Sequence, residues 1–128
     1  MEPSLRYFKL AIKVAKNSTS KFRLGAVLTK KKQVISIGYN AMRKTHPIQQ
    51  QICNNDFLRG IHAEVHACVG VEENDLNKAV LYVVRIKKDD KLCMSKPCND
   101  CQRFLYNVGV SKVHYTTDFE TINTIAFK

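Results

Sequence analysis

Residues 79–116 read AVLYVVRIKKDDKLCMSKPCNDCQRFLYNVGVSKVHYT and carry the clearest structural signal in the chain. The first segment, Ala79–Ile86, is almost continuously apolar, which is typical of a strand buried on both faces. After a charged loop, Cys98–Asn107 has the apolar spacing of a helix, and Gly109 is a suitable stop. Val110–Thr116 predicts another strand. A strand, a helix and a strand in this order predict a parallel crossover.

The residues before this stretch predict two helices and a hairpin. Apolar residues recur at helical spacing over residues 4–17, which indicates an amphipathic helix. Two strands, Phe22–Thr29 and Gln33–Tyr39, are separated only by three lysines and therefore predict a hairpin. Residues 40–60 are polar and irregular, and Ala63–Val71 predicts the next helix.

The chain end predicts a last short helix through Phe127, with Asp118 as its N-cap. The predicted order is then helix, strand, strand, helix, strand, helix, strand, helix. Such alternation is typical of an α/β protein whose four-stranded sheet carries helices on both faces. We expect a single domain over residues 1–128, because this length suits one domain with its own core.

Composition limits the classes of protein that need to be considered. Hydrophobic residues make up 45% and charged residues 25% of the chain, which is ordinary for a soluble domain. The longest apolar run, Ala79–Val84, is far shorter than a membrane span, and the first residues lack a signal-peptide core. We therefore expect a cytoplasmic protein with no membrane partner. The formal charge of +10 favours an anionic partner, such as a nucleotide or single-stranded nucleic acid, although a solvated basic face explains it equally well.

Three side chains form a candidate zinc site: His62, Cys98 and Cys101. Zinc prefers imidazole nitrogen and thiolate sulfur, and three protein ligands leave the open position typical of a catalytic site. Pro97 precedes Cys98, so the two cysteines are expected in the first turn of a helix, where the helix end favours thiolates. Glu64 follows His62 by two residues and is a candidate proton carrier beside the metal.

The same residue types also occur in other kinds of site. A Cys-x-x-Cys pair is also common in redox proteins and in structural zinc knuckles, and His66 would complete a four-ligand knuckle. A metalloprotease helix needs glutamate directly after its first histidine, whereas Ala63 occupies that position. We expect His66 to lie on the helix surface or to support the ligands.

The motifs His62-Ala63-Glu64 and Pro97-Cys98-Asn99-Asp100-Cys101 resemble those of the zinc-dependent cytidine/deoxycytidylate deaminase superfamily. This resemblance implies a three-layer α/β/α fold with a mixed sheet of four to five strands, the fifth near the C-terminus. It also implies that the two cysteines and the histidine bind zinc and that Glu64 moves protons. The resemblance further implies that Asn40 and the backbone N–H of Ala63 contact the substrate, and that the protein is a homo-oligomer.

The substrate is less well defined by the sequence. The first hypothesis is a hydrolytic deaminase of a pyrimidine nucleotide such as dCMP, with Arg43 as a candidate phosphate contact and Tyr115 as a candidate base contact. The alternative is a deaminase of single-stranded DNA or RNA, favoured by the charge but opposed by the lack of an aromatic and basic track outside expected core positions. A non-catalytic zinc module is disfavoured by the presence of Glu64. A second zinc site at His46, Cys53 and Cys93 has only its ligand types in its favour.

Overall fold

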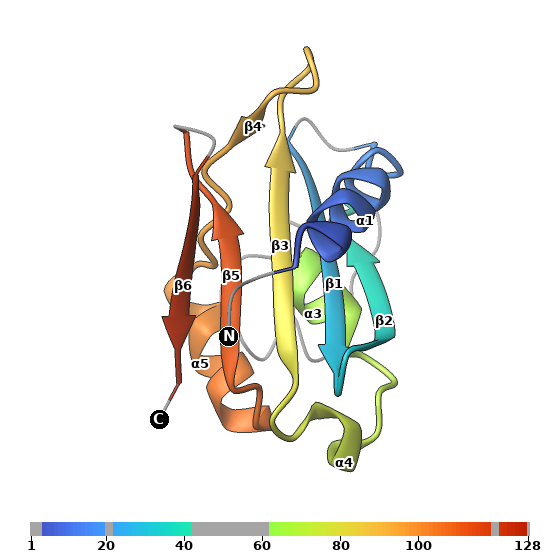
Figure 1. Cartoon of the computed structure of the whole chain (residues 1–128), viewed down its shortest axis with the longest axis vertical. Coiled ribbons are helices and arrows are strands. Elements are labelled where there is room, and N and C mark those ends of the chain that lie inside the picture. The colour runs from blue at the N-terminus through green and yellow to red at the C-terminus, as the bar shows by residue number, and fades with distance from the viewer. Residues whose placement is uncertain (1–3, 20–21, 42–61, 119–120, 128) are drawn as a thin grey trace.

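The structure is a computed structural model that describes residues 4–19, 22–41, 62–118 and 121–127. Its centre is a six-stranded mixed sheet (Figure 1). The main path has the order β2-β1-β3-β5-β6, and β4 pairs with β3 beside this path. The strands are β1 (Arg23–Lys30), β2 (Gln33–Tyr39), β3 (Val80–Ile86), β4 (Leu92–Cys93), β5 (Lys112–Thr116) and β6 (Ile122–Ala126). The predicted α/β class and mixed sheet are confirmed, with six strands in place of four to five.

Strand directions follow from the connections. β1 and β2 form the predicted antiparallel hairpin, and Lys31 and Lys32 in its turn have φ values of 52° and 65°. This left-handed backbone matches the twist that a two-residue hairpin turn requires. β3 and β5 are parallel, with Val80 opposite Lys112, and α5 (Asn99–Val108) joins them. The predicted crossover over residues 79–116 is therefore confirmed.

Helices cover both faces of the sheet, so the molecule has three layers (Figure 1). α1 (Leu5–Ala15) packs on one face against a cluster that includes Val27, Tyr82 and Val84. On the other face, α3 (Ala63–Cys68) and α5 pack with residues that include Leu28 and Leu81. Successive strand residues point to opposite faces, which explains how one apolar strand such as β3 serves both cores.

The predicted C-terminal helix is wrong, because residues 122–126 form β6. This strand pairs antiparallel with β5, from Lys112 opposite Ala126 to Thr116 opposite Ile122. The segment is rich in threonine and isoleucine, and such β-branched residues favour strands. Asp118 does not cap a helix, since its Oδ1 accepts a hydrogen bond from the backbone N–H of Met94 at 2.8 Å.

The helix predicted over Ala63–Val71 is also shorter than expected. α3 ends at Cys68, and a further turn of helix, α4 (Glu73–Leu76), follows in a polar stretch for which no helix was predicted. Gly70 has a φ of 82° and turns the chain between the two helices. Within the described ranges, no helix combines the length and the apolar character that a bilayer crossing needs.

Candidate metal centre

The position of His62 depends on the close packing of α3 against β2. His62 is the N-cap of α3, and Ala63, the first residue of the helix, is fully buried. Gly38 in β2 faces this helix, and a Cβ atom at Gly38 would lie 2.4 Å from the Ala67 nitrogen and 2.7 Å from the Ala63 oxygen. Only a glycine permits this approach, so the sheet sets the position of α3 and hence of His62.

The two cysteines lie at the start of α5. Cys98 is the N-cap of this helix, and its Sγ accepts a hydrogen bond from the backbone N–H of Cys101 at 3.4 Å. Cys101 itself is fully buried. At the other end of α5, Gly109 adopts a left-handed φ of 97° and closes the helix, as the sequence predicted.

The segment before Pro97 is tied to the sheet by a network that the sequence analysis did not find. Ser95 is buried, and its hydroxyl donates to the Val83 carbonyl at 2.8 Å and accepts the Thr116 N–H at 2.8 Å. The Thr116 hydroxyl donates to the Cys93 carbonyl at 2.8 Å. These bonds anchor the approach to the cysteines. One feature of the sequence could have indicated this network. A threonine ends the apolar segment Val110–Thr116, and a buried hydroxyl there needs hydrogen-bond partners.

The donor atoms of His62, Cys98 and Cys101 converge on one point. His62 Nδ1 lies 3.3 Å from Cys101 Sγ and 4.0 Å from Cys98 Sγ, and the three atoms lie within 4.8 Å of one another. Tetrahedral zinc bonds of about 2.0 Å to nitrogen and 2.3 Å to sulfur separate such ligand atoms by about 3.5 to 3.8 Å. The observed distances span this range, so the three side chains fit a zinc ion without rearrangement of the backbone.

The environment of Cys98 favours its thiolate. A hydrogen bond with the Cys101 side chain is the largest cause that lowers the pKa of Cys98, and the pKa reaches about 4 although burial opposes the shift. Hydrogen bonds from His62 and from the Cys101 backbone N–H contribute in the same direction. A thiolate at neutral pH is the form that binds a metal.

Glu64 is a buried acid beside these donors. Its side chain is 3% exposed, and burial raises its pKa above the ordinary value, while the charge of His62 acts in the opposite direction. The charge of Cys98 also raises the pKa of Glu64, and a hydrogen bond with the Cys101 side chain lowers it, so the carboxyl lies beside Cys101. A buried carboxyl with a raised pKa is a better proton acceptor than an exposed one.

His66 does not join this group. Its Nδ1 faces the backbone of Tyr39, 3.0 Å from the nitrogen and 2.9 Å from the oxygen, and the two rings meet edge to face at 5.0 Å. Of the described residues, only His62, Cys98 and Cys101 form a cluster of metal-binding type. His66 therefore holds α3 against β2, as expected for a supporting residue, and does not complete a four-ligand knuckle.

The other predicted site residues have different surroundings. The Asn40 Oδ1 accepts hydrogen bonds from the Leu24 N–H at 2.9 Å and the Ser18 hydroxyl at 2.7 Å, and its Nδ2 donates to the Phe22 carbonyl at 2.6 Å. Tyr115 lies in β5 and is 7% exposed. Arg43, His46 and Cys53 lie outside the described residues, while the Cys93 thiol donates to the Arg85 carbonyl at 3.7 Å.

Residues 1–117 match the family described as the cytidine and deoxycytidylate deaminase zinc-binding region. The chain belongs to this deaminase family. Its members are hydrolases that act on C–N bonds, and zinc is the cofactor of this deaminase. No curated protein sequence matches the chain significantly.

Solved structures of deaminases share the fold. The cytidine deaminase from Burkholderia pseudomallei has a TM-score of 0.66 at 16% identity, with 98% of this chain and 93% of that chain covered. The apo dCMP deaminase from the cyanophage S-TIM5 has a TM-score of 0.61 at 23% identity, with 91% and 86% covered. RibD from Acinetobacter baumannii gives 0.55 at 24% identity, over 88% of this deaminase but 27% of RibD. At these identities the likeness establishes the fold, and it confirms the predicted cytidine-deaminase-like architecture.

Proposed function

We propose that this deaminase hydrolyses the amino group of the cytosine ring in a free pyrimidine nucleotide such as dCMP, to give the uracil nucleotide and ammonia. The observation that carries the proposal is the convergence of His62 Nδ1 and two cysteine Sγ atoms within 4.8 Å, with the buried Glu64 carboxyl beside them. Three donors leave one tetrahedral position for water or substrate.

Each residue of the centre has a distinct role in the proposal. His62, Cys98 and Cys101 hold zinc, which when bound supplies a Lewis acid that makes water nucleophilic at neutral pH. The Glu64 carboxylate would accept a proton from the attacking water and deliver it to the ring nitrogen. It would then take the remaining proton from the new hydroxyl group on the ring carbon and deliver it to the amine, so that the C–N bond breaks, ammonia leaves and a carbonyl remains. Burial of Glu64 supports this role, because burial raises the pKa of the carboxyl and so makes it a better proton acceptor.

Asn40 and Ala63 are proposed as substrate contacts. Because the Asn40 Oδ1 already accepts two hydrogen bonds from the chain, Asn40 would contact the substrate as a donor, through its second Nδ2 hydrogen. The backbone N–H of Ala63, at the start of α3, is a second proposed donor. Arg43 and Tyr115 remain candidate contacts to phosphate and base.

The choice of dCMP rests on the family description and on a structural relative. The family covers cytidine and deoxycytidylate deaminases, and the S-TIM5 dCMP deaminase has been solved in complex with dCMP and dUMP. The test is ammonia release from dCMP, dCTP, deoxycytidine and a single-stranded deoxycytidine oligonucleotide, measured in parallel with the zinc-loaded enzyme. We expect turnover to be highest with dCMP. Turnover confined to the oligonucleotide would overturn this choice of substrate.

One surface favours the alternative polynucleotide substrate. Phe22 was expected in a strand, yet its side chain is 52% exposed and the Arg85 guanidinium lies 4.2 Å from its ring centroid. A cavity of about 480 Å³ adjoins this pair and is also lined by Lys87 and Lys88. Exposed aromatic and cationic side chains together suit the stacking of single-stranded bases.

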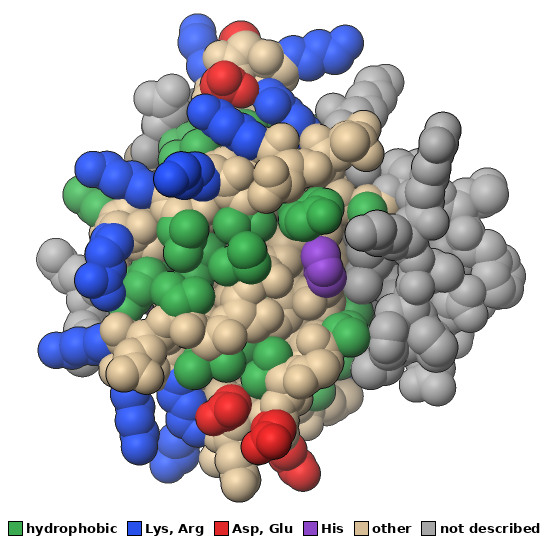
Figure 2. All heavy atoms as spheres, turned by 90° about the vertical axis from the view of Figure 1, so that its right-hand side faces the viewer, with side chains coloured by type: hydrophobic (Ala, Val, Ile, Leu, Met, Phe, Trp, Pro, Cys, Tyr) green, Lys and Arg blue, Asp and Glu red, His purple; other side chains and the backbone are tan. Residues whose placement is uncertain are grey.

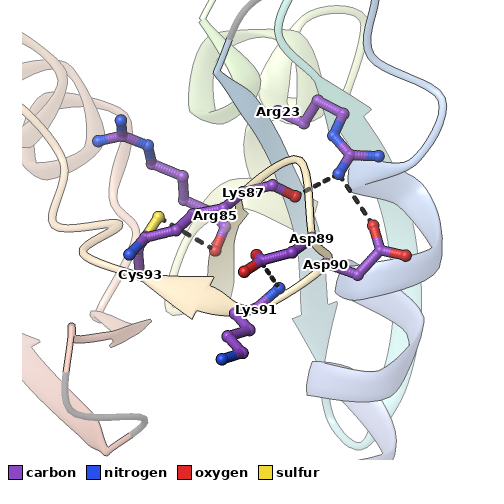
Figure 3. A network of polar contacts seen from close by, with 7 residues as sticks. All are labelled: Arg23, Arg85, Lys87, Asp89, Asp90, Lys91 and Cys93. Atoms are coloured by element: carbon purple, nitrogen blue, oxygen red, sulfur yellow. Dashed lines mark hydrogen bonds and ion pairs between the residues drawn. The ribbon is translucent and has the colours of Figure 1, made fainter.

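The surrounding turn between β3 and β4 is itself well ordered by polar contacts (Figure 3). Arg23 donates to Asp90 Oδ1 at 2.9 Å and to the Lys87 carbonyl, so its charge is already paired. The variant Phe22→Ala distinguishes the two substrate hypotheses. If the substrate is a polynucleotide, we expect lower turnover of an oligonucleotide, whereas turnover of dCMP should stay nearly unchanged.

Two further expectations stay predictions. A homo-oligomer is compatible with β2, an edge strand on which Val34 and Ile37 are 44% and 45% exposed. Figure 2 shows hydrophobic side chains on the face that it presents. Location in the cytoplasm is the other prediction. Light scattering measures the oligomeric state, and cell fractionation tests the location.

A further inference from the structure

A second concave surface lies far from the metal centre. A cavity of about 490 Å³ opens on the α1 face of the sheet, where β1 ends and where β3 and β5 begin. Thr29, Val80 and Lys112 line it and lie opposite one another on the three strands. The metal centre instead lies with α3 on the other face of the sheet, where α3 packs against Gly38, the partner of Ala26 in β1. The two sites are therefore on opposite faces of the sheet.

The lining of this cavity is strongly cationic. Six basic side chains line it, from α1, the β1–β2 hairpin, the turn before β3 and β5: Arg6, Lys30, Lys31, Lys32, Lys78 and Lys112. No aspartate or glutamate is among the described residues that line the cavity, and the ion pairs found between described residues use none of the six cations. Like charges that converge on one hollow repel each other, and a bound anion would relieve this repulsion.

The backbone around these lysines is unusual. In the described chain, four residues other than glycine have positive φ, and three of them are lysines of this cavity: Lys31, Lys32 and Lys78, at 52°, 65° and 65°. Glycine and asparagine are the residues that adopt this conformation readily, so lysine here carries a conformational cost. Strained backbone of this kind gathers at functional sites, where the side chain is needed for another purpose.

The volume of the cavity and the side chains of its floor limit the kinds of ligand that it can bind. Its volume lies within the range of about 300 to 1,000 Å³ that is typical of sites for small molecules. Tyr7, Tyr82 and His114 form part of the floor but are only 3% to 6% exposed, so they offer no open rings on which successive bases could stack. Cations around a single hollow, rather than along a track, fit a compact ligand.

We propose that this cavity binds a compact polyphosphate, either inorganic or carried by a small molecule such as a nucleotide. The lysines of the hairpin and of the turn before β3 would meet its phosphate oxygens, and Arg6 and Lys112 would close the sides. This goes beyond the proposed deaminase reaction, and it does not depend on the metal or on Glu64.

The test is calorimetric titration of the zinc-loaded enzyme with tripolyphosphate and with ATP at 0.15 M salt, which weakens non-specific attraction. The test variant is Lys31→Asn with Lys32→Gly, which removes two charges and places the preferred Asn-Gly pair in the hairpin turn. The matched control is Lys9→Gln with Lys13→Gln, which removes two charges from exposed positions of α1 outside the cavity.

We expect saturable binding of one ligand per chain, a loss of at least tenfold in the hairpin variant and a loss below threefold in the control. Tighter binding of ATP than of tripolyphosphate would identify a nucleotide as the carrier, and equal binding would identify the inorganic chain. Absence of saturation, or equal losses in the two variants, would overturn the proposal. Displacement of tripolyphosphate by a lower concentration of a 12-nucleotide single strand would also overturn it, in favour of nucleic acid. Repetition with Glu64→Gln keeps this result separate from the deaminase proposal, because binding should persist in an inactive enzyme.

Discussion

Glu64 lies two residues after His62, buried at the start of a helix whose N-cap is that histidine. For Glu64→Gln we expect kcat to fall by about 10² to 10⁴, the usual contribution of a general acid and base. The amide keeps the size of the side chain but cannot carry the proton. Zinc content should stay at one ion per chain, because the three donor side chains remain. Wild-type turnover with dCMP in this variant would remove Glu64 from the mechanism.

His114 makes the stability of the fold depend on pH. It is 3% exposed, packs on Tyr82 with ring centroids 4.9 Å apart, and its Nδ1 lies 2.7 Å from the Thr124 hydroxyl. Burial is the main cause that lowers its pKa from 6.5 to about 4, with the charge of Lys112 as a smaller cause. The unfolded chain therefore takes up a proton that the folded chain resists, and stability falls as the pH drops from 6.5 towards 4.

We expect this effect to cost about 1 to 2 kcal/mol between pH 7 and pH 4.5, after allowance for screening by solvent near the cavity. Urea unfolding at both pH values measures it, and His114→Gln should show a smaller decrease than the wild type. An equal decrease in the two proteins would assign the pH dependence to other groups.

At the scale of single residues, the sequence was sufficient to predict which donors come together. Imidazole and thiolate types, and the three-residue spacing of Cys98 and Cys101, limit the choice strongly. The hydrogen bonds of Asn40 and of Ser95 could not be predicted from the sequence, because they join segments that are brought together only in the folded chain.

Among the elements, α3 is the one on which the metal centre depends most. Gly38→Ala would place a Cβ atom 2.4 Å from the Ala67 backbone nitrogen, so the helix would have to shift away from β2. We expect a loss of about 1 to 3 kcal/mol in stability, as for other cases of overpacking, and weaker zinc binding because His62 moves with α3. Urea unfolding and competition with a zinc chelator measure the two effects.

The matched control for this prediction is Ser36→Ala, a small change on the same strand, for which we expect a change in stability within about 0.5 kcal/mol. Unchanged stability and zinc affinity in Gly38→Ala would show that α3 tolerates a wider separation from the sheet.

Elements with a strong pattern were predicted well, and those with a weak pattern were not. The β3 segment is a continuous apolar run, and the α5 segment has apolar residues at helical spacing. Both elements form close to their predicted limits. The segment Ile122–Ala126 was predicted as a helix because Asp118 resembles an N-cap. The segment forms a strand because each of its residues pairs with a residue of β5. The local sequence contains no information on this pairing.

For the whole molecule, the two main cores on either side of the sheet are built from residues other than the three metal donors. A chain of this length buries enough apolar surface to fold alone, so removal of zinc by a chelator should abolish activity but leave a cooperative unfolding transition. The melting temperature should fall and should recover as zinc is added back, since the ion binds only the folded state. Loss of the far-UV circular dichroism signal on chelation would instead indicate a structural metal.

The three-layer arrangement was predictable at this scale from the alternation of helices and strands, and the family resemblance strengthened it. The position of β1 between β2 and β3 could not be predicted, because the local pattern contains no information on which strands become neighbours.

Zinc-edge X-ray absorption of the purified enzyme, together with its metal content, determines which atoms bind the metal. We expect one zinc per chain with two sulfur ligands at about 2.3 Å and two lighter ligands at about 2.0 to 2.1 Å, from His62 and from the open position. A spectrum with no sulfur, or with three or more sulfur ligands, would contradict this expectation.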